Sequence, residues 1–137
     1  MSESVPPVHP VRVVLAGHCV PDAYMLKNAV ERFLPAASVV SVNTTADLDR
    51  ELVDADIVLV NRLIDGYFEH SIGQVLIRAL WERAPHAAFI LISNVPEAQQ
   101  DAEAAGAMPG FGKSELYSAK AQQCLIAAAA RSARRES

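Results

Sequence analysis

Short apolar runs alternate along the chain with longer stretches in which apolar residues recur at helical spacing. The apolar runs are residues 11–16, 37–42, 55–61, 88–92 and 108–111. Each is too short for a helix and ends at glycine or polar residues, which predicts five β-strands. The core of run 55–61 is aliphatic without polar alternation. This pattern is typical of a strand covered on both faces, and therefore of a parallel sheet between helices.

Four helices are predicted between the strands and a fifth after the last strand. Pro21-Asp22 marks the start of the first, and Thr44-Thr45 caps the second. The apolar positions are Ala23, Leu26, Val30 and Phe33 in the first, Leu48, Leu52 and Val53 in the second, and Ile72, Val75, Leu76, Ala79 and Leu80 in the third. The fourth, within 96–105, has a thin apolar face and ends at Gly106.

The last helix is expected to open at Lys113-Ser114. Its buried stripe would be Tyr117, Ala121, Cys124, Leu125 and Ala128. Five strands alternating with five helices predict a three-layer, doubly wound α/β domain, because right-handed crossovers between strands produce a parallel sheet. We expect a disordered lead over residues 1–10, the domain over 11–131 and a flexible tail over 132–137.

Composition restricts the function classes that fit this architecture. The formal net charge of the 137 residues is -4, which argues against a nucleic-acid-binding surface. The basic cluster Arg131, Arg134 and Arg135 is interpreted as a solvated helix end that complements the helix dipole.

No segment approaches the roughly 20 apolar residues that cross a bilayer. The first residues lack the pattern of a signal peptide. Cys19 and Cys124 show neither a disulfide framework nor metal spacing, which favours a reduced, cytoplasmic protein.

Polar side chains follow several of the predicted strands. His18 comes after the first strand, Asn61 ends the third and Ser93 follows the fourth. In parallel sheets, ligands and chemistry are found beyond the carboxyl ends of the strands. Asn61 is therefore the first candidate for a functional side chain.

Two segments resemble the receiver domain of response regulators. Residues 106–113, Gly-Ala-Met-Pro-Gly-Phe-Gly-Lys, resemble the segment that ends at the invariant receiver lysine, and residues 56–61 resemble the strand that ends at the phosphoacceptor aspartate. Ser93 matches the hydroxyl residue that contacts the phosphoryl group. The resemblance covers roughly residues 11–130 and implies a flavodoxin-like sheet with strand order 2-1-3-4-5.

The chain departs from the receiver pattern where the chemistry resides. Gly17 and His18 stand at the acidic pair that binds magnesium, and Asn61 stands at the phosphoacceptor. Hard cations prefer carboxylate oxygens, and a neutral amide is no nucleophile towards phosphorus. We therefore expect a degenerate pocket of Gly17, His18, Asn61, Ser93 and Lys113, in which Lys113 bonds the side-chain oxygen of Asn61. Phosphorylation, metal, cofactor and enzymatic activity are all expected to be absent.

Other functions fit single features. A small ligand would use His18, Asn61, Ser93 and Lys113 at the end of the sheet. An enzyme would centre on His18 and Cys19, although we interpret the histidine as a hydrogen-bonded loop residue and Cys19 as a small hydrophobe. His18 also matches one position of a cobalamin-binding motif, and residues 107–114 fit a loose phosphate-loop pattern.

The last helix carries the predicted interaction surface. Residues 125–130 are apolar around more than one helical face, which indicates either an interface or helix propensity alone. The interface candidates are Tyr117, Gln122, Leu125, Ile126 and Ala129. The resemblance implies that the fourth helix, fifth strand and fifth helix form a signalling or dimer surface. We thus expect a stand-alone pseudo-receiver, a protein-interaction module of bacterial signalling that binds a protein partner or forms a homodimer through the last helix.

Overall fold

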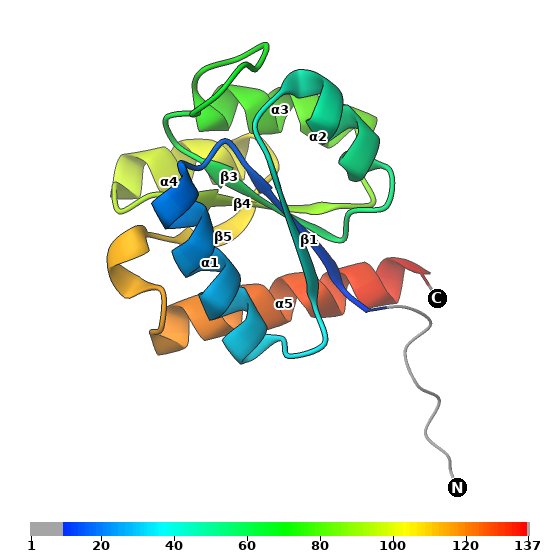
Figure 1. Ribbon diagram of the computed structural model, residues 1–137, viewed down its shortest axis with the longest axis vertical. Helices are drawn as coiled ribbons and strands as arrows, with labels where there is room; N and C mark the ends of the chain where they lie inside the picture. Colours follow the sequence, from blue (N-terminus) through cyan, green and yellow to red (C-terminus); the bar gives the residue numbers. More distant parts are fainter. Residues whose placement is uncertain (1–9, 137) are drawn as a thin grey trace, which may run out of the picture.

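Five parallel strands form one sheet between two helical layers in the computed structural model, which describes residues 10–136 (Figure 1). The strands are β1 (Arg12–Ala16), β2 (Ser38–Val42), β3 (Ile57–Asn61), β4 (Ala88–Ile92) and β5 (Met108–Phe111). The helices are α1 (Val20–Phe33), α2 (Thr45–Leu52), α3 (Gly73–Arg83), α4 (Pro96–Ala104), the short 3-10 helix η1 (Lys113–Glu115) and α5 (Ala119–Glu136). The order across the sheet is β2-β1-β3-β4-β5, which confirms the predicted doubly wound, flavodoxin-like architecture.

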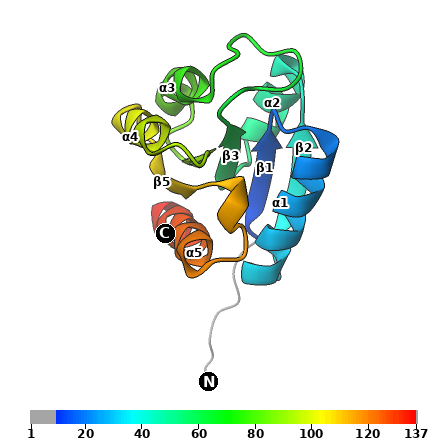
Figure 2. The same cartoon turned by 90° about the vertical axis from the view of Figure 1, so that its left-hand side faces the viewer.

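The helices cover the two faces of the sheet unequally. Helices α1 and α5 lie on one face, and α2, α3 and α4 lie on the other (Figure 2). Strand β3 pairs with β1 and with β4, and its residues 57–60 are completely buried. The expectation that this strand is covered on both faces is therefore confirmed, and Asn61 emerges at the end of the central strand.

Local signals account for two of the helix ends. The Thr44 hydroxyl accepts a hydrogen bond from the Asp47 amide at 3.1 Å, as an N-cap does. Gly106 follows α4 with a φ of +115°, and a Cβ at this position would lie 2.4 Å from Cδ1 of Trp81. Only glycine meets both demands, which explains why α4 stops here.

The predicted start of the last helix is wrong. Residues Lys113–Glu115 form a 3-10 turn in which the Glu115 carboxylate accepts from the Gly112 amide at 3.1 Å. The helix begins at Ala119, where the Ser118 hydroxyl accepts from the Ala121 amide at 3.2 Å. Tyr117 lies before the helix and is 51% exposed, so it is not part of the buried stripe.

The predicted face of α3 is rotated by one residue. Its buried residues are Gly73, Leu76, Ile77 and Leu80, which recur at i, i+3, i+4 and i+7. Val75 is 47% exposed, although it was expected in the core. The helix begins at Gly73, which packs against the Asn61 carbonyl so closely that a Cβ would lie 2.3 Å from that oxygen.

Helix α5 continues past the boundary expected at residue 131. Ser132 is buried, and its hydroxyl donates to Oδ1 of Asp56 at 2.6 Å. The other carboxylate oxygen of Asp56 accepts from the Arg12 amide at 2.8 Å. The last turns of α5 are thus tied to the amino-terminal end of the sheet. Of the predicted lead, residues 1–10, all but Pro10 lie outside the described residues, as does residue 137. Over the described part of the chain, no helix combines the length and apolarity needed to span a membrane.

Candidate functional site

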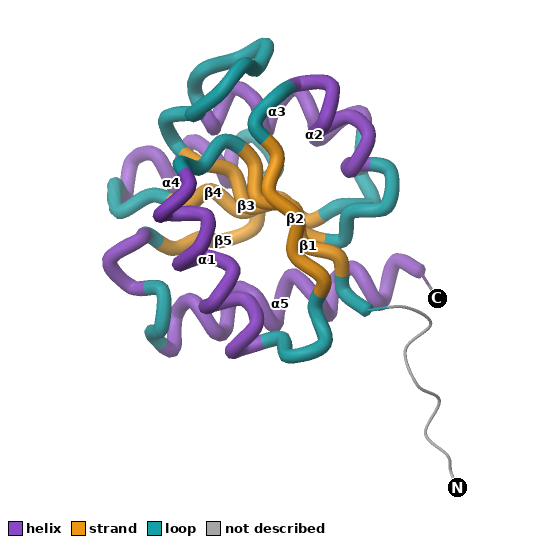
Figure 3. The backbone as a smooth tube through the Cα atoms, viewed as in Figure 1, coloured by secondary structure: helices purple, strands orange, loops and turns teal. Residues whose placement is uncertain are grey.

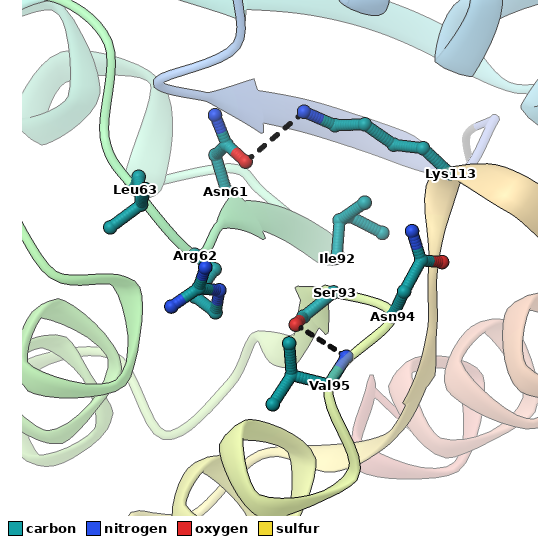
Figure 4. A pocket seen from close by; sticks show the side chains of 8 residues that line it. All are labelled: Asn61, Arg62, Leu63, Ile92, Ser93, Asn94, Val95 and Lys113. Carbon is teal, nitrogen blue, oxygen red and sulfur yellow. Dashed lines mark hydrogen bonds between the residues drawn. The ribbon is translucent and has the colours of Figure 1, made fainter.

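A cavity of about 260 Å³ opens at the carboxyl ends of β3 and β4 (Figure 4). It is lined by Asn61, Arg62, Leu63, Ile92, Ser93, Asn94, Val95 and Lys113. Parallel strands place their carboxyl ends at one edge, so residues far apart in sequence meet here. The structure brings Asn61, Ser93 and Lys113 of the predicted pocket together in this cavity.

Asn61 is held by hydrogen bonds at both ends of its side-chain amide. Nδ2 donates to the Gly17 carbonyl at 2.9 Å. Oδ1 accepts from Nζ of Lys113 at 3.3 Å, the bond drawn in Figure 4. The expected bond between Lys113 and Asn61 is therefore present. Because the amide donates to a carbonyl and accepts from an ammonium, its orientation is fixed by its two neighbours.

Lys113 makes a shorter contact with Asp22, in the first turn of α1. Nζ lies 2.6 Å from Oδ2 of Asp22, and both side chains are about one-third exposed. The hydrogen bond from Lys113 lowers the pKa of Asp22. Asp22 was not among the predicted site residues. Its place in the sequence, at a helix start, indicated only that a carboxylate would lie near the carboxyl end of β1.

Gly17 lies beneath a segment that crosses the end of β1. Its φ is +77°, and a Cβ would lie 2.6 Å from Cγ2 of Ile64. The Asp65 amide also donates to the Gly17 carbonyl at 2.8 Å. A side chain at position 17 would meet both backbone strain and a packed neighbour, so this position has no room for a metal-binding carboxylate.

Residues 62–72, here called the β3–α3 strap, hold Ile64 in place. The strap is the loop at the top of Figures 1 and 3. The Tyr67 amide donates to the Asn43 carbonyl at 2.8 Å, and the Tyr67 carbonyl accepts from Thr45 at 3.0 Å. The side chain of Asn43 donates to the carbonyls of His18 and Asp65. The strap is thereby pinned across the ends of β1 and β2.

His18 is buried and does not line the cavity. It is 1% exposed, and its Nε2 lies 2.9 Å from the Leu59 carbonyl. A carbonyl only accepts, so Nε2 carries the proton. Burial, the largest cause, lowers the pKa of His18 from 6.5 to about 4, which keeps the imidazole neutral at pH 7. His18 lines a second cavity, of about 590 Å³, and not the one lined by Asn61, Ser93 and Lys113, so the expected ligand-binding edge does not bring the four residues into one cavity.

The cavity has a cationic lining. Arg62 and Lys113 contribute to it, and no acidic residue does. The Ser93 side chain is buried, and its hydroxyl accepts from the Val95 amide at 3.0 Å. Such a cavity suits an oxyanion better than a cation.

The residues present do not fit magnesium. Gly17, His18 and Asn61 stand where the resemblance requires carboxylates, and Ile64 packs over the first of them. Within residues 10–136, no group of three His, Cys, Asp or Glu side chains is placed to hold a metal ion.

The other sites suggested by sequence are not assembled. His18 is bonded to Leu59, and Cys19, at the start of α1, contacts Asp22, so the two do not form a nucleophile and base pair. In the phosphate-loop-like segment a Cβ on Gly112 would lie 1.6 Å from Oδ1 of Asn94. That oxygen accepts from the amide and hydroxyl of Ser114, so the segment forms a filled turn.

The predicted interface residues do not all reach the surface. Ile126 is 47% and Tyr117 51% exposed, and Gln122 is exposed as well. Leu125 was expected at the interface but is completely buried, because its helical position faces the sheet. Ala129 is half-buried against the same core. Between β5 and α5, a cavity of about 320 Å³ is lined by Met108, Pro109, Lys120, Gln123, Cys124 and Ala127.

The fold is similar to that of solved response regulators. One from Thermotoga maritima has a TM-score of 0.70 at 17% identity, over 88% of this chain and 98% of its own. The non-phosphorylated receiver domain of the stress response regulator RcsB from Escherichia coli has a TM-score of 0.71 at 15% identity, over 87% and 92%. An orphan response regulator of H. pylori has a TM-score of 0.63 at 14% identity, over 89% and 96%. The chain therefore has a receiver-like fold. No protein-family model matches it, and a search of curated proteins gives no match either.

Proposed function

We propose that this chain is a pseudo-receiver, a module of bacterial signal transduction that acts through protein contacts and without aspartyl phosphorylation. The observation that carries the proposal is Asn61, held between the Gly17 carbonyl and Lys113 at the end of the central strand. A neutral amide in this position has no nucleophilic oxygen to offer a phosphoryl donor. The receiver-like fold of the structural neighbours supports a role in response-regulator signalling.

Two further contacts support a fixed pocket. Lys113 is neutralised by Asp22 at 2.6 Å, so it does not need a phosphoryl group to balance its charge. The packing of Ile64 over Gly17 removes the space for a metal-binding carboxylate.

Both cysteines are free thiols, which supports the reducing cytoplasm as the compartment.

Intact-mass analysis after incubation with acetyl phosphate and magnesium tests the proposal. The expected result is no phosphoryl adduct, while a receiver that retains its aspartate is modified in the same reaction. A stoichiometric adduct that requires magnesium would contradict the proposal.

The output is proposed to pass through the α5 surface, defined as Tyr117, Gln122 and Ile126. These exposed side chains include an aromatic and an aliphatic group, and large apolar groups of this kind dominate interface energies. A protein partner, or a second copy, docks on this surface. Affinity capture with Ile126→Asp should lose a protein that is retained by Val53→Asp, which alters an aliphatic residue, 71% exposed, directly after α2. Capture of the same proteins by both variants would contradict the proposal that partners dock on the α5 surface.

A second candidate is reversible binding of a small anion in the 260 Å³ cavity. The observation that favours it is Arg62, in a lining that contains no acidic residue and that also includes Lys113, the partner of Asp22. Titration with inorganic phosphate should shift the amide resonances of Ser93 and Asn94, and Arg62→Gln should weaken the effect. Equal shifts in the variant, or none in either protein, would exclude this site.

A further inference from the structure

The two edges of the sheet differ in whether another strand can join them. At β5, Pro109 has no N–H, and the register with β4 shifts between Ile90 and Ile92. The Leu91 carbonyl is bonded instead by the side chain of Gln99, at 2.9 Å. Proline and bulges prevent an edge from pairing further. Strand β5 is therefore a closed edge.

Strand β2, at the opposite edge in Figure 2, has none of these protections. Its sequence is Ser-Val-Val-Ser-Val, without charge or proline, and its register with β1 is regular. The amide of Ser38 donates to Val11, and the carbonyl of Val42 accepts from Gly17. Because alternate residues of a parallel strand face the same neighbour, Val39 and Ser41 direct their N–H and C=O groups outwards. Within residues 10–136 these groups have no partner.

Just beyond β2, the same edge of the sheet already pairs with another segment of the chain, the β3–α3 strap. Asn43 lies two residues after Ser41 and therefore faces the same way, and its carbonyl accepts from the Tyr67 amide. Thr45 then donates to the Tyr67 carbonyl, which gives a single parallel bridge between Thr44 and Tyr67. The strap thus covers the end of the edge and leaves Val39 and Ser41 open.

We propose that β2 pairs in antiparallel fashion with β2 of a second copy of this chain. The open groups of Val39 and Ser41 are symmetric about Val40, so a twofold axis through Val40 lets Val39 of each copy exchange both backbone bonds with Ser41 of the other. The sheets of the two copies become continuous. This inference is independent of the proposed function, which places the partner at α5.

The side chains around the axis suit this pairing. Val40 is half-buried against the core beneath α2 and α3, and Val39 is half-buried against the core on the other face. In the dimer Val40 meets its own copy at a non-hydrogen-bonded position, where Cα atoms come closest and β-branched pairs are favourable. Ser38 and Ser41 are exposed and uncharged, so no like charges meet along the strand when it faces itself.

Light scattering at increasing concentration tests the dimer. The mass should rise from that of one chain, 14.7 kDa, towards twice that value. Ser41→Pro should hold the mass at one chain, because it removes only an outward N–H and leaves every bond to β1. Ser41→Thr, which keeps the N–H, should dimerise as the unaltered chain does. Ile126→Asp should also leave the dimer intact.

Amide hydrogen exchange of the unaltered chain gives a second measurement, which does not depend on a variant folding. Protection of the Val39 and Ser41 amides should increase with protein concentration, whereas the Val40 amide, which faces β1, should be protected throughout. A single-chain mass at all concentrations would overturn the inference. So would exchange at Val39 and Ser41 that is independent of concentration, or a dimer that Ile126→Asp dissociates and Ser41→Pro does not.

Discussion

Lys113 and Asp22 form an ion pair across 91 residues of sequence, with 2.6 Å between Nζ and Oδ2. The carboxylate that neutralises the lysine therefore comes from the first turn of α1 and not from the end of β3. Asp22 stabilises the amino-terminal end of its helix at the same time. Asn61 can then serve as a neutral hydrogen-bonding group between Lys113 and Gly17.

Removal of the Asp22 charge is expected to have a small effect on folding. Both side chains of the pair are about one-third exposed, and exposed ion pairs contribute about 0.2 to 1 kcal/mol. Asp22→Asn should reduce the free energy of unfolding in urea by an amount in that range. Asp49→Asn is the matched control, since Asp49 pairs with Arg83 at 2.8 Å on the surface. A loss of several kcal/mol only in Asp22→Asn would show that the pair supports the pocket more strongly than its exposure indicates.

The closure of the metal position by packing predicts a specific coupling between Gly17 and Ile64. Gly17→Ala should reduce stability by about 2 to 5 kcal/mol, the sum of the cost of a positive φ and of overpacking. Ile64→Ala removes the methyl group that the new Cβ would meet.

A double-mutant cycle by urea denaturation separates these two costs. The penalty of Gly17→Ala should be smaller by about 1 to 3 kcal/mol when Ile64 is already alanine, because contacting residues couple by such amounts. The remainder is backbone strain, which Ile64 does not affect. An equal penalty in both backgrounds would mean that Ile64 does not block position 17.

The sequence alone predicted the order of the strands and the contact of Asn61 with Lys113, because strand ends in a parallel sheet share one edge. It did not predict which helical residues are buried, since this depends on how each helix is rotated about its axis. Leu125 and Ile126 are neighbours of equal hydrophobicity, yet one is completely buried and the other 47% exposed. The contact of Asp22 with Lys113 depends on how α1 lies against η1, which no local pattern encodes.

The side chain of Gln99 is predicted to contribute to the stability of the closed edge. Its Nε2 donates to the carbonyls of Leu91 and Ser93, beside Pro109, which has no N–H to offer. Gln99→Leu should leave these carbonyls unpaired and cost about 1 to 3 kcal/mol. The neighbouring exposed residue gives the control, as Gln100→Leu should change stability by no more than about 0.5 kcal/mol. Equal thermal denaturation midpoints for Gln99→Leu and the unaltered chain would show that water replaces the Gln99 amide without loss of stability.

The bond between Ser132 and Asp56 predicts that the end of α5 stabilises the domain. Ser132→Ala should cost about 1.5 to 3 kcal/mol, the range for hydrogen bonds to charged groups, because the hydroxyl lies 2.6 Å from a buried carboxylate. Ser71→Ala, at an exposed strap position, is the control. Urea denaturation of both variants measures the difference. A change in Ser132→Ala no larger than that of the control would show that the last turns of α5 do not contribute.

Burial of His18 predicts a loss of stability at mildly acidic pH. The pKa of His18 is lowered from 6.5 to about 4 in the folded protein. Between these values the unfolded chain binds a proton that the folded chain does not, so stability falls as the pH is lowered through this window. The full effect is about 3 kcal/mol, from a shift of about 2.5 units at 1.36 kcal/mol each. The Asp22 carboxyl, whose pKa is also lowered, contributes in the same direction but only below its usual pKa of 3.8.

Urea denaturation of the unaltered chain and of His18→Gln at pH 7, 6, 5 and about 4 isolates this contribution. Glutamine can still donate to the Leu59 carbonyl but has no proton to bind, so the variant should lose less stability than the unaltered chain as the pH falls. His86→Gln controls for the loss of an imidazole as such, since it removes an exposed imidazole that contacts the Leu52 carbonyl. Parallel pH profiles for His18→Gln and the unaltered chain would contradict the prediction. They would mean that His18 binds a proton as readily in the folded protein as in the unfolded chain.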